Sequence, residues 1–121
     1  MALHRRGATD PVLCNPDLYR VIFENERVRV LEYTDRPGDR TEPHRHPDSV
    51  MYTLTSFRRR VSADGRQAEV ELPGGQVRWL GAQEHTGHNI GETPTHSILV
   101  ELKEPAPTAT PSTLGPQPPT G

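Results

Sequence analysis

Polar and apolar residues alternate along much of the chain with the period of a β-strand. The segment 27–33 alternates almost strictly, which is typical of a strand buried on one face. Further short runs rich in β-branched and aromatic residues follow, separated by turn signals at intervals of roughly 8–12 residues. No run of about ten residues has a 3.6-residue period. The pattern predicts an all-β domain, a sandwich or barrel of about eight short strands. The expected strands cover residues 18–23, 27–33, 50–55, 58–61, 67–72, 76–80, 85–90 and 97–102, and a histidine-bearing segment, 44–46, follows a turn.

Composition changes at both ends of this pattern. Residues 1–16 show no period and contain two X-Pro turns, so we expect an N-terminal arm. Residues 105–121 hold six of the thirteen prolines and a single large apolar residue, Leu114. Such a segment cannot bury enough apolar surface to offset its ordering entropy, so we expect a disordered Pro-rich tail. The predicted folded domain is therefore 17–104.

Length and charge exclude several classes of protein. A chain of 121 residues is long enough for one domain. Its 14 basic and 16 acidic residues form no basic stripe, which argues against a nucleic-acid partner. No segment approaches the ~20 apolar residues of a membrane helix, and no apolar run follows the N-terminal arginines as in a secretory signal. With Cys14 as its one cysteine the chain forms no internal disulfide, and we predict a cytoplasmic protein.

Three histidines are the strongest chemical signal. His44 and His46 are two residues apart, so on a strand both side chains point to the same face. His85 lies in a second glycine-bounded segment far along the chain. Neutral imidazole is the commonest metal ligand near neutral pH, and three of them suit Fe, Zn, Ni, Mn or Cu. The alternative is a set of partly buried histidines that bond backbone groups.

Two glycine-bounded segments carry a family resemblance. Gly38, His44 and His46 have the identities and spacing of the first motif of the cupin superfamily, but the motif's ligand Glu falls on Val50 and its closing Gly on Phe57.

Gly74, His85 and Asn89 match the second cupin motif, whose Pro and middle Gly positions hold Leu80 and Ala82. The resemblance spans roughly residues 17–103. Within it the chain looks like the small single-domain bacterial cupins. It implies a single jelly-roll β-barrel with His44, His46 and His85 as metal ligands.

The missing glutamate shapes the functional expectation. Some cupin-type dioxygenases hold Fe(II) with three neutral histidines, so the resemblance implies a non-haem Fe(II) dioxygenase acting on a small organic acid or diketone-like substrate. A metal-dependent isomerase, cyclase or lyase and a non-catalytic metal- or ligand-binding sensor are the alternatives. Val50 cannot ligate, so the three histidines hold the metal alone, Asp48 or Glu84 replaces the glutamate, or metal binding is weakened or lost. The resemblance also implies a homodimer formed by exchange of edge strands.

Strand parity assigns the remaining candidates. Tyr52 shares parity with the first two histidines if Pro47 and Asp48 insert no bulge, which would make it a proton donor or substrate-orienting group in the pocket. His88 is expected on the face opposite His85, and Trp79 in the core. The run 58–60, three arginines, is expected as a solvated edge, because three consecutive strand residues cannot share a face.

Overall fold

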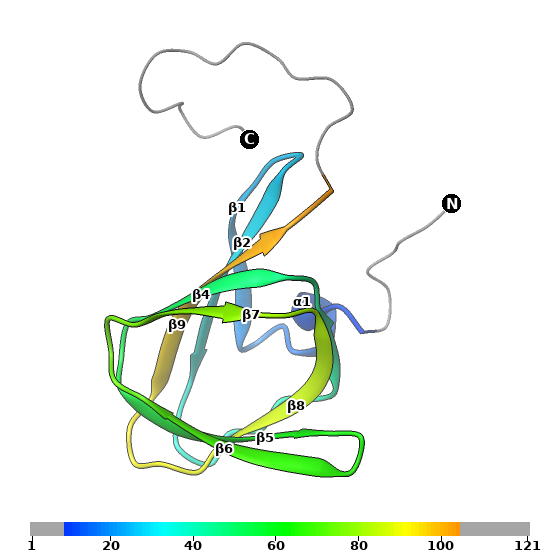
Figure 1. Ribbon diagram of the computed structural model, residues 1–121. Coiled ribbons are helices and arrows are strands. Elements are labelled where there is room, and N and C mark those ends of the chain that lie inside the picture. The colour runs from blue at the N-terminus through cyan, green and yellow to red at the C-terminus, as the bar shows by residue number, and fades with distance from the viewer. Residues whose placement is uncertain (1–8, 105–121) are drawn as a thin grey trace.

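Nine antiparallel strands form a barrel of two facing sheets in the computed structural model, which describes residues 9–104 (Figure 1). One sheet has the order β1-β2-β9-β4-β7 and the other the order β3-β8-β5-β6. The all-β barrel prediction is confirmed. The strands are β1 (Tyr19–Glu24), β2 (Val28–Asp35), β3 (His44–His46), β4 (Ser49–Thr53), β5 (Phe57–Ala63), β6 (Arg66–Leu72), β7 (Val77–Leu80), β8 (Gln83–Asn89) and β9 (Thr95–Leu102).

The apolar core is small and belongs to the five-stranded sheet. Leu31 and Tyr33 of β2, Leu99 of β9 and Tyr19 of β1 form its buried cluster. Their positions alternate with half-buried ones along β2 and β9, as strand geometry requires. Much of the remaining interior is polar, and it is there that the fold brings charged groups together.

Arg29 forms the centre of a buried ionic network at one end of the barrel. Its Nε donates to Glu101 Oε1 at 2.9 Å, and its Nη2 donates to Asp10 Oδ1 at 2.7 Å. The three side chains are each less than 10% exposed. Buried ions are tolerated only when each is paired and hydrogen-bonded, because desolvation costs several kcal/mol per charge. The network therefore joins β2, β9 and the segment before β1.

The segment before β1 is better ordered than the arm expected for residues 1–16. Residues 11–14 form a helical turn, α1 (Pro11–Cys14), and the Asp10 carboxylate caps it by accepting from Val12 N at 3.2 Å and Leu13 N at 3.3 Å. Asn15 Oδ1 then accepts from the backbone N of Glu42 at 2.7 Å, ahead of β3. Residues 1–8 and the predicted tail at 105–121 lie outside the described residues.

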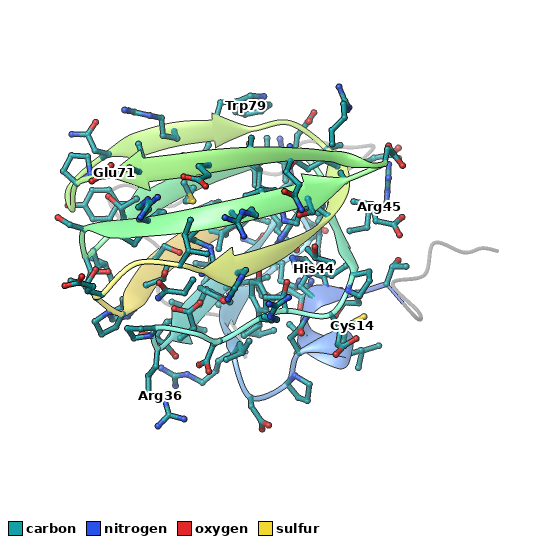
Figure 2. All side chains as sticks on the ribbon, turned by 90° about the horizontal axis from the view of Figure 1, so that it is seen from below. Cys14, Arg36, His44, Arg45, Glu71 and Trp79 are labelled. Carbon is teal, nitrogen blue, oxygen red and sulfur yellow. The ribbon has the colours of Figure 1, made fainter. Side chains whose placement is uncertain are left out.

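The outer face of β4 and β7 is apolar. Tyr52, Val77 and Trp79 are 42%, 60% and 61% exposed. Figure 2 shows Trp79 on the outer side of the sheet, away from the barrel interior. The core position expected for Trp79 is therefore wrong, because inward and outward positions cannot be told apart from parity on a four-residue edge strand.

Within residues 9–104, no helix has the length and apolar character needed to cross a membrane.

We expect Arg29→Met to lower the free energy of unfolding by about 3–5 kcal/mol, because it removes a buried guanidinium that pairs with two buried carboxylates. The matched control is Arg20→Met, whose partner is Glu32 and whose side chain is 72% exposed. That pair should contribute less than about 1 kcal/mol. Chemical denaturation of the two variants checks this, and equal losses would contradict the structural role given to Arg29.

Candidate metal centre

The three candidate histidines converge because β3 pairs with β8. His44 lies opposite His85 in the antiparallel register, and His46 follows on the same face of β3. One nitrogen from each ring lies within 4.8 Å of the others. His44 and His46 are each 1% exposed, and β3 packs beside α1, where Figure 2 labels His44. The three side chains expected to share a site therefore meet.

Each of the three rings is oriented through its Nδ1 atom. His44 Nδ1 lies 2.7 Å from the Glu42 carbonyl oxygen, and His46 Nδ1 lies 3.1 Å from Glu101 Oε2. A carbonyl and an ionised carboxylate only accept hydrogen bonds, so both Nδ1 atoms carry the proton. Nε2 of each ring is then unprotonated.

The Nδ1 atom of His85 also donates to an acceptor, in this case a side-chain amide oxygen. Its Nδ1 lies 2.7 Å from Gln83 Oε1. Gln83 Nε2 donates to the Gly81 carbonyl at 3.0 Å, which fixes the amide with its oxygen toward the ring. All three histidines thus donate from Nδ1 and present the lone pair of Nε2, the arrangement by which outer hydrogen bonds orient metal-binding imidazoles.

The donor set fits a divalent transition metal held by three neutral ligands. Among residues 9–104, these histidines form the cluster of His, Cys, Asp and Glu side chains close enough to share an ion. Neither replacement carboxylate takes the missing position. Asp48 Oδ1 accepts from Ala82 N at 2.8 Å, and Glu84 is exposed on β8. The site supplies nitrogen ligands and leaves further coordination positions open.

Burial keeps the metal-free rings of His44 and His85 neutral. Desolvation is the largest cause, and it lowers the pKa of His44 to about 4 and that of His85 to about 3. Burial opposes ionisation of Glu101, but the hydrogen bond from His46 and the charge of Arg29 outweigh it and hold its pKa below the ordinary value. At neutral pH an ion therefore meets neutral imidazoles at His44 and His85.

The tyrosine beside the histidines is Tyr19, and the assignment of Tyr52 is wrong. Tyr52 points outward, and Met51 takes the inward position on β4. The chain leaves one sheet after β3 and enters the other at β4, so strand parity does not carry across Pro47. Tyr19 Oη instead lies 3.3 Å from Nε2 of both His44 and His46. No local spacing in the sequence indicates this contact, which depends on the position of β1.

A cavity of about 300 Å³ lies between the sheets, and the histidines line one side of it. Its other walls are largely apolar, and its size is at the small end for small-molecule sites. Arg59 also lines it, whereas Arg58 and Arg60 face outward and pair with Glu69. The expected solvated position therefore holds for Arg58 and Arg60 and is wrong for Arg59, and the expected edge is wrong because β5 lies between β8 and β6.

His88 and Asn89, in the segment of the second motif, do not line the cavity. His88 lies away from the cavity, opposite Arg60 on β5, as its odd spacing from His85 predicted. Asn89 is buried, and its amide closes the following loop by donating to the Thr93 carbonyl at 2.9 Å and accepting from Gly91 N at 3.0 Å.

Solved structures with the same fold are found, although no family model matches the sequence and a search of the curated proteins gives no match. A cupin domain from Bordetella pertussis Tohama I is 27% identical with a TM-score of 0.67, over 72% of this chain and 93% of that one. A double-stranded β-helix protein from Klebsiella pneumoniae is 19% identical with a TM-score of 0.57, over 70% and 75%. A variant of Bacillus subtilis oxalate decarboxylase is 23% identical with a TM-score of 0.50, over 67% of this chain and 23% of that one.

The fold and site define a small antiparallel β-barrel with a three-histidine cluster at its interior, suited to a divalent metal. The Bordetella cupin domain supports the family expected from the two motifs, and the other two neighbours show the same fold. The chain is a small member of the cupin superfamily.

We expect the metal-free protein to lose stability as the pH falls from about 6.5 to about 5. The unfolded histidines protonate near pH 6.5, but His44 and His85 stay neutral in the fold until about 4 and about 3. The unfolded chain therefore binds protons first, at up to about 1.4 kcal/mol per pH unit for each histidine. Urea unfolding at several pH values checks this. His85→Gln should give a shallower slope, and an unchanged slope would contradict the burial argument.

Proposed function

We propose that this protein is a metal-dependent cupin enzyme in which His44, His46 and His85 hold Fe(II), and that it acts as a dioxygenase on a small organic acid or diketone-like substrate. One observation carries the proposal: the Nδ1 atom of each ring is committed to an acceptor, and one nitrogen from each ring lies within 4.8 Å of the others. A neutral ligand set keeps the ion electrophilic and leaves positions for an anionic substrate and oxygen.

The chain's own groups complete the site. Burial raises the pKa of Tyr19, so its hydroxyl keeps its proton beside the triad. That hydroxyl can donate a hydrogen bond to a substrate oxygen held next to His44 and His46. The apolar cavity walls exclude water from the reacting groups, and Fe(II) would supply activation of oxygen and of the bound substrate.

The same site supports a second candidate, a metal-dependent isomerase, cyclase or lyase. Here the ion, Zn, Ni or Mn, would polarise a carbonyl, and a protonated hydroxyl at the right place would serve proton transfer. Tyr19 Oη lies 3.3 Å from two of the ligand nitrogens, where it could serve such a proton transfer, and this position is the observation that supports the second candidate. A sensor module without turnover is the third outcome that the experiments below separate.

We expect the untagged wild type to bind about one divalent ion per chain and His44→Ala, His46→Ala and His85→Ala each to lose it, because among residues 9–104 these three histidines are the cluster that could hold an ion. The matched control is His88→Ala, on the same strand as His85 but directed away from the cavity. Elemental analysis after equilibrium dialysis measures this, with circular dichroism to verify folding. A wild type that cannot be loaded with Fe(II), Zn(II), Ni(II), Mn(II) or Cu(II) would refute the metal proposal.

Oxygen uptake then separates the candidate reactions. The Fe(II)-loaded protein should consume oxygen with members of a panel of small organic acids and diketones, and Tyr19→Phe should retain its metal but turn over more slowly. Turnover with Zn or Ni in the absence of oxygen would favour the isomerase, cyclase or lyase. Stoichiometric metal with no turnover on the panel would leave the sensor module.

The homodimer implied by the resemblance remains a proposal, and we place it on the outer apolar face of β4 and β7. Burial of Tyr52, Val77 and Trp79 against a second copy would remove three exposed apolar side chains from water. Trp79→Glu should shift the mass measured by sedimentation equilibrium from dimer to monomer. Gln67→Glu, exposed on β6 of the other sheet, should leave it unchanged. A wild-type monomer would refute this interface.

A further inference from the structure

Arg59 is a charged side chain of the cavity wall to which the metal proposal gives no role. It comes from β5 and is 12% exposed, with its guanidinium 5.1 Å from the centroid of the Tyr33 ring. Its Nη1 donates to Asp35 Oδ2 and, at 3.2 Å, to Thr95 Oγ1. One corner of the guanidinium is therefore fixed to the barrel wall.

Asp35 is occupied on both of its oxygens. Oδ1 accepts from Asn89 Nδ2 and from Thr95 N, each at 3.0 Å. Oδ2 accepts from the Tyr33 hydroxyl at 2.6 Å and from Arg59. A carboxylate that already accepts from four donors holds Arg59 through Nη1. It cannot accept further hydrogen bonds from the other N–H groups of the guanidinium.

The other edge of the guanidinium is open. Among residues 9–104, no hydrogen bond is found from Nε or Nη2 of Arg59, although arginine commonly binds a carboxylate with two parallel N–H groups. In the same part of the chain no fully buried side-chain nitrogen or oxygen lacks a partner. These N–H groups therefore reach open space, and the space that Arg59 lines is the cavity.

Gly87 makes room for this edge. A Cβ atom at Gly87 would lie 2.3 Å from Arg59 Nη2, so only a residue without a side chain lets the guanidinium lie there. Gly87 is two residues from His85 on the same face of β8, which corresponds to roughly 7 Å along the strand. A small molecule can therefore contact the open edge of Arg59 at one end and the histidines at the other.

We propose that Arg59 forms an anion subsite in the cavity, where Nε and Nη2 bind the carboxylate of a small organic acid with an apolar body. The walls beside it, including Val61, Val70 and Leu80, suit an aliphatic chain. The subsite deepens the proposed function by selecting among substrates. It rests on that function only in placing the far end of the acid at the histidine triad.

The experiment compares two probes of nearly equal shape on the metal-free protein. Isovalerate carries the carboxylate, and isovaleramide replaces it with an uncharged group. By calorimetry or NMR titration, the wild type should bind the acid about tenfold or more tightly than the amide, because hydrogen bonds to a charged group are the stronger ones. Equal binding of the two probes, or no binding of either at millimolar concentration, overturns the proposal.

Variants identify Arg59 as the source of the preference. The double substitution Arg59→Gln with Asp35→Asn removes both charges of the buried pair, so neither is left uncompensated. It should abolish the preference for the acid, whereas Arg60→Gln, which removes the same charge from the outer face, should retain it. A double variant that folds and still prefers the acid overturns the proposal.

Gly87→Ala tests the position of the guanidinium with its charge intact. The added methyl group takes the place of Nη2, and the clash is with the far end of a flexible side chain, so the domain should stay folded. The preference for isovalerate should fall, while the thermal midpoint changes little. An unchanged preference contradicts the geometry.

Metal content measured on the same proteins keeps the two proposals separate. A preference for the acid in a wild type that binds no metal supports the anion subsite and refutes the metal enzyme. Stoichiometric metal without that preference supports the metal site and overturns the subsite.

Discussion

The structure depends on a buried carboxylate, Glu101, which holds a guanidinium with one oxygen and an imidazole with the other. Through Arg29 it reaches Asp10, the residue that caps α1, and through His46 it reaches the candidate metal centre. A desolvated charge is stable only when both of its oxygens are satisfied, so these elements must come together for any of them to be buried. The same contact therefore stabilises the barrel and fixes one ring of the site.

The strands were predictable from the sequence, but their inward faces were not. Alternation along β2 marks a half-buried strand whichever set of side chains faces inward. In the structure Arg29 and Leu31 point to the interior, while Val28 and Val30 lie on the half-buried outer face. A barrel whose interior holds a buried ionic network can turn a charged residue inward on such a strand, because buried partners, and not hydropathy, decide which charges can face inward.

Prediction of the site succeeded where the geometry is local and failed where it depends on register. His44 and His46 share a face because any strand places residues two apart together. Tyr52 was misplaced because the chain changes sheets after Pro47, whereas Tyr19 reaches the same rings from a strand with no spacing signal. Arg59 was within reach of sequence reasoning, since the middle residue of three on a strand must face away from its two neighbours.

The interior electrostatics indicate which ligands the cavity suits. With Val50 at the position of the cupin glutamate, no carboxylate of residues 9–104 joins the triad, and Glu101 behind His46 is paired with Arg29, which also pairs with Asp10. An ion bound by neutral nitrogens would keep its full positive charge toward the cavity, where low polarity strengthens its attraction for an anion. Arg59 directs unpaired N–H donors into the same space. Both features favour a small anionic ligand over a neutral one of the same shape, and they do so from opposite ends of the cavity.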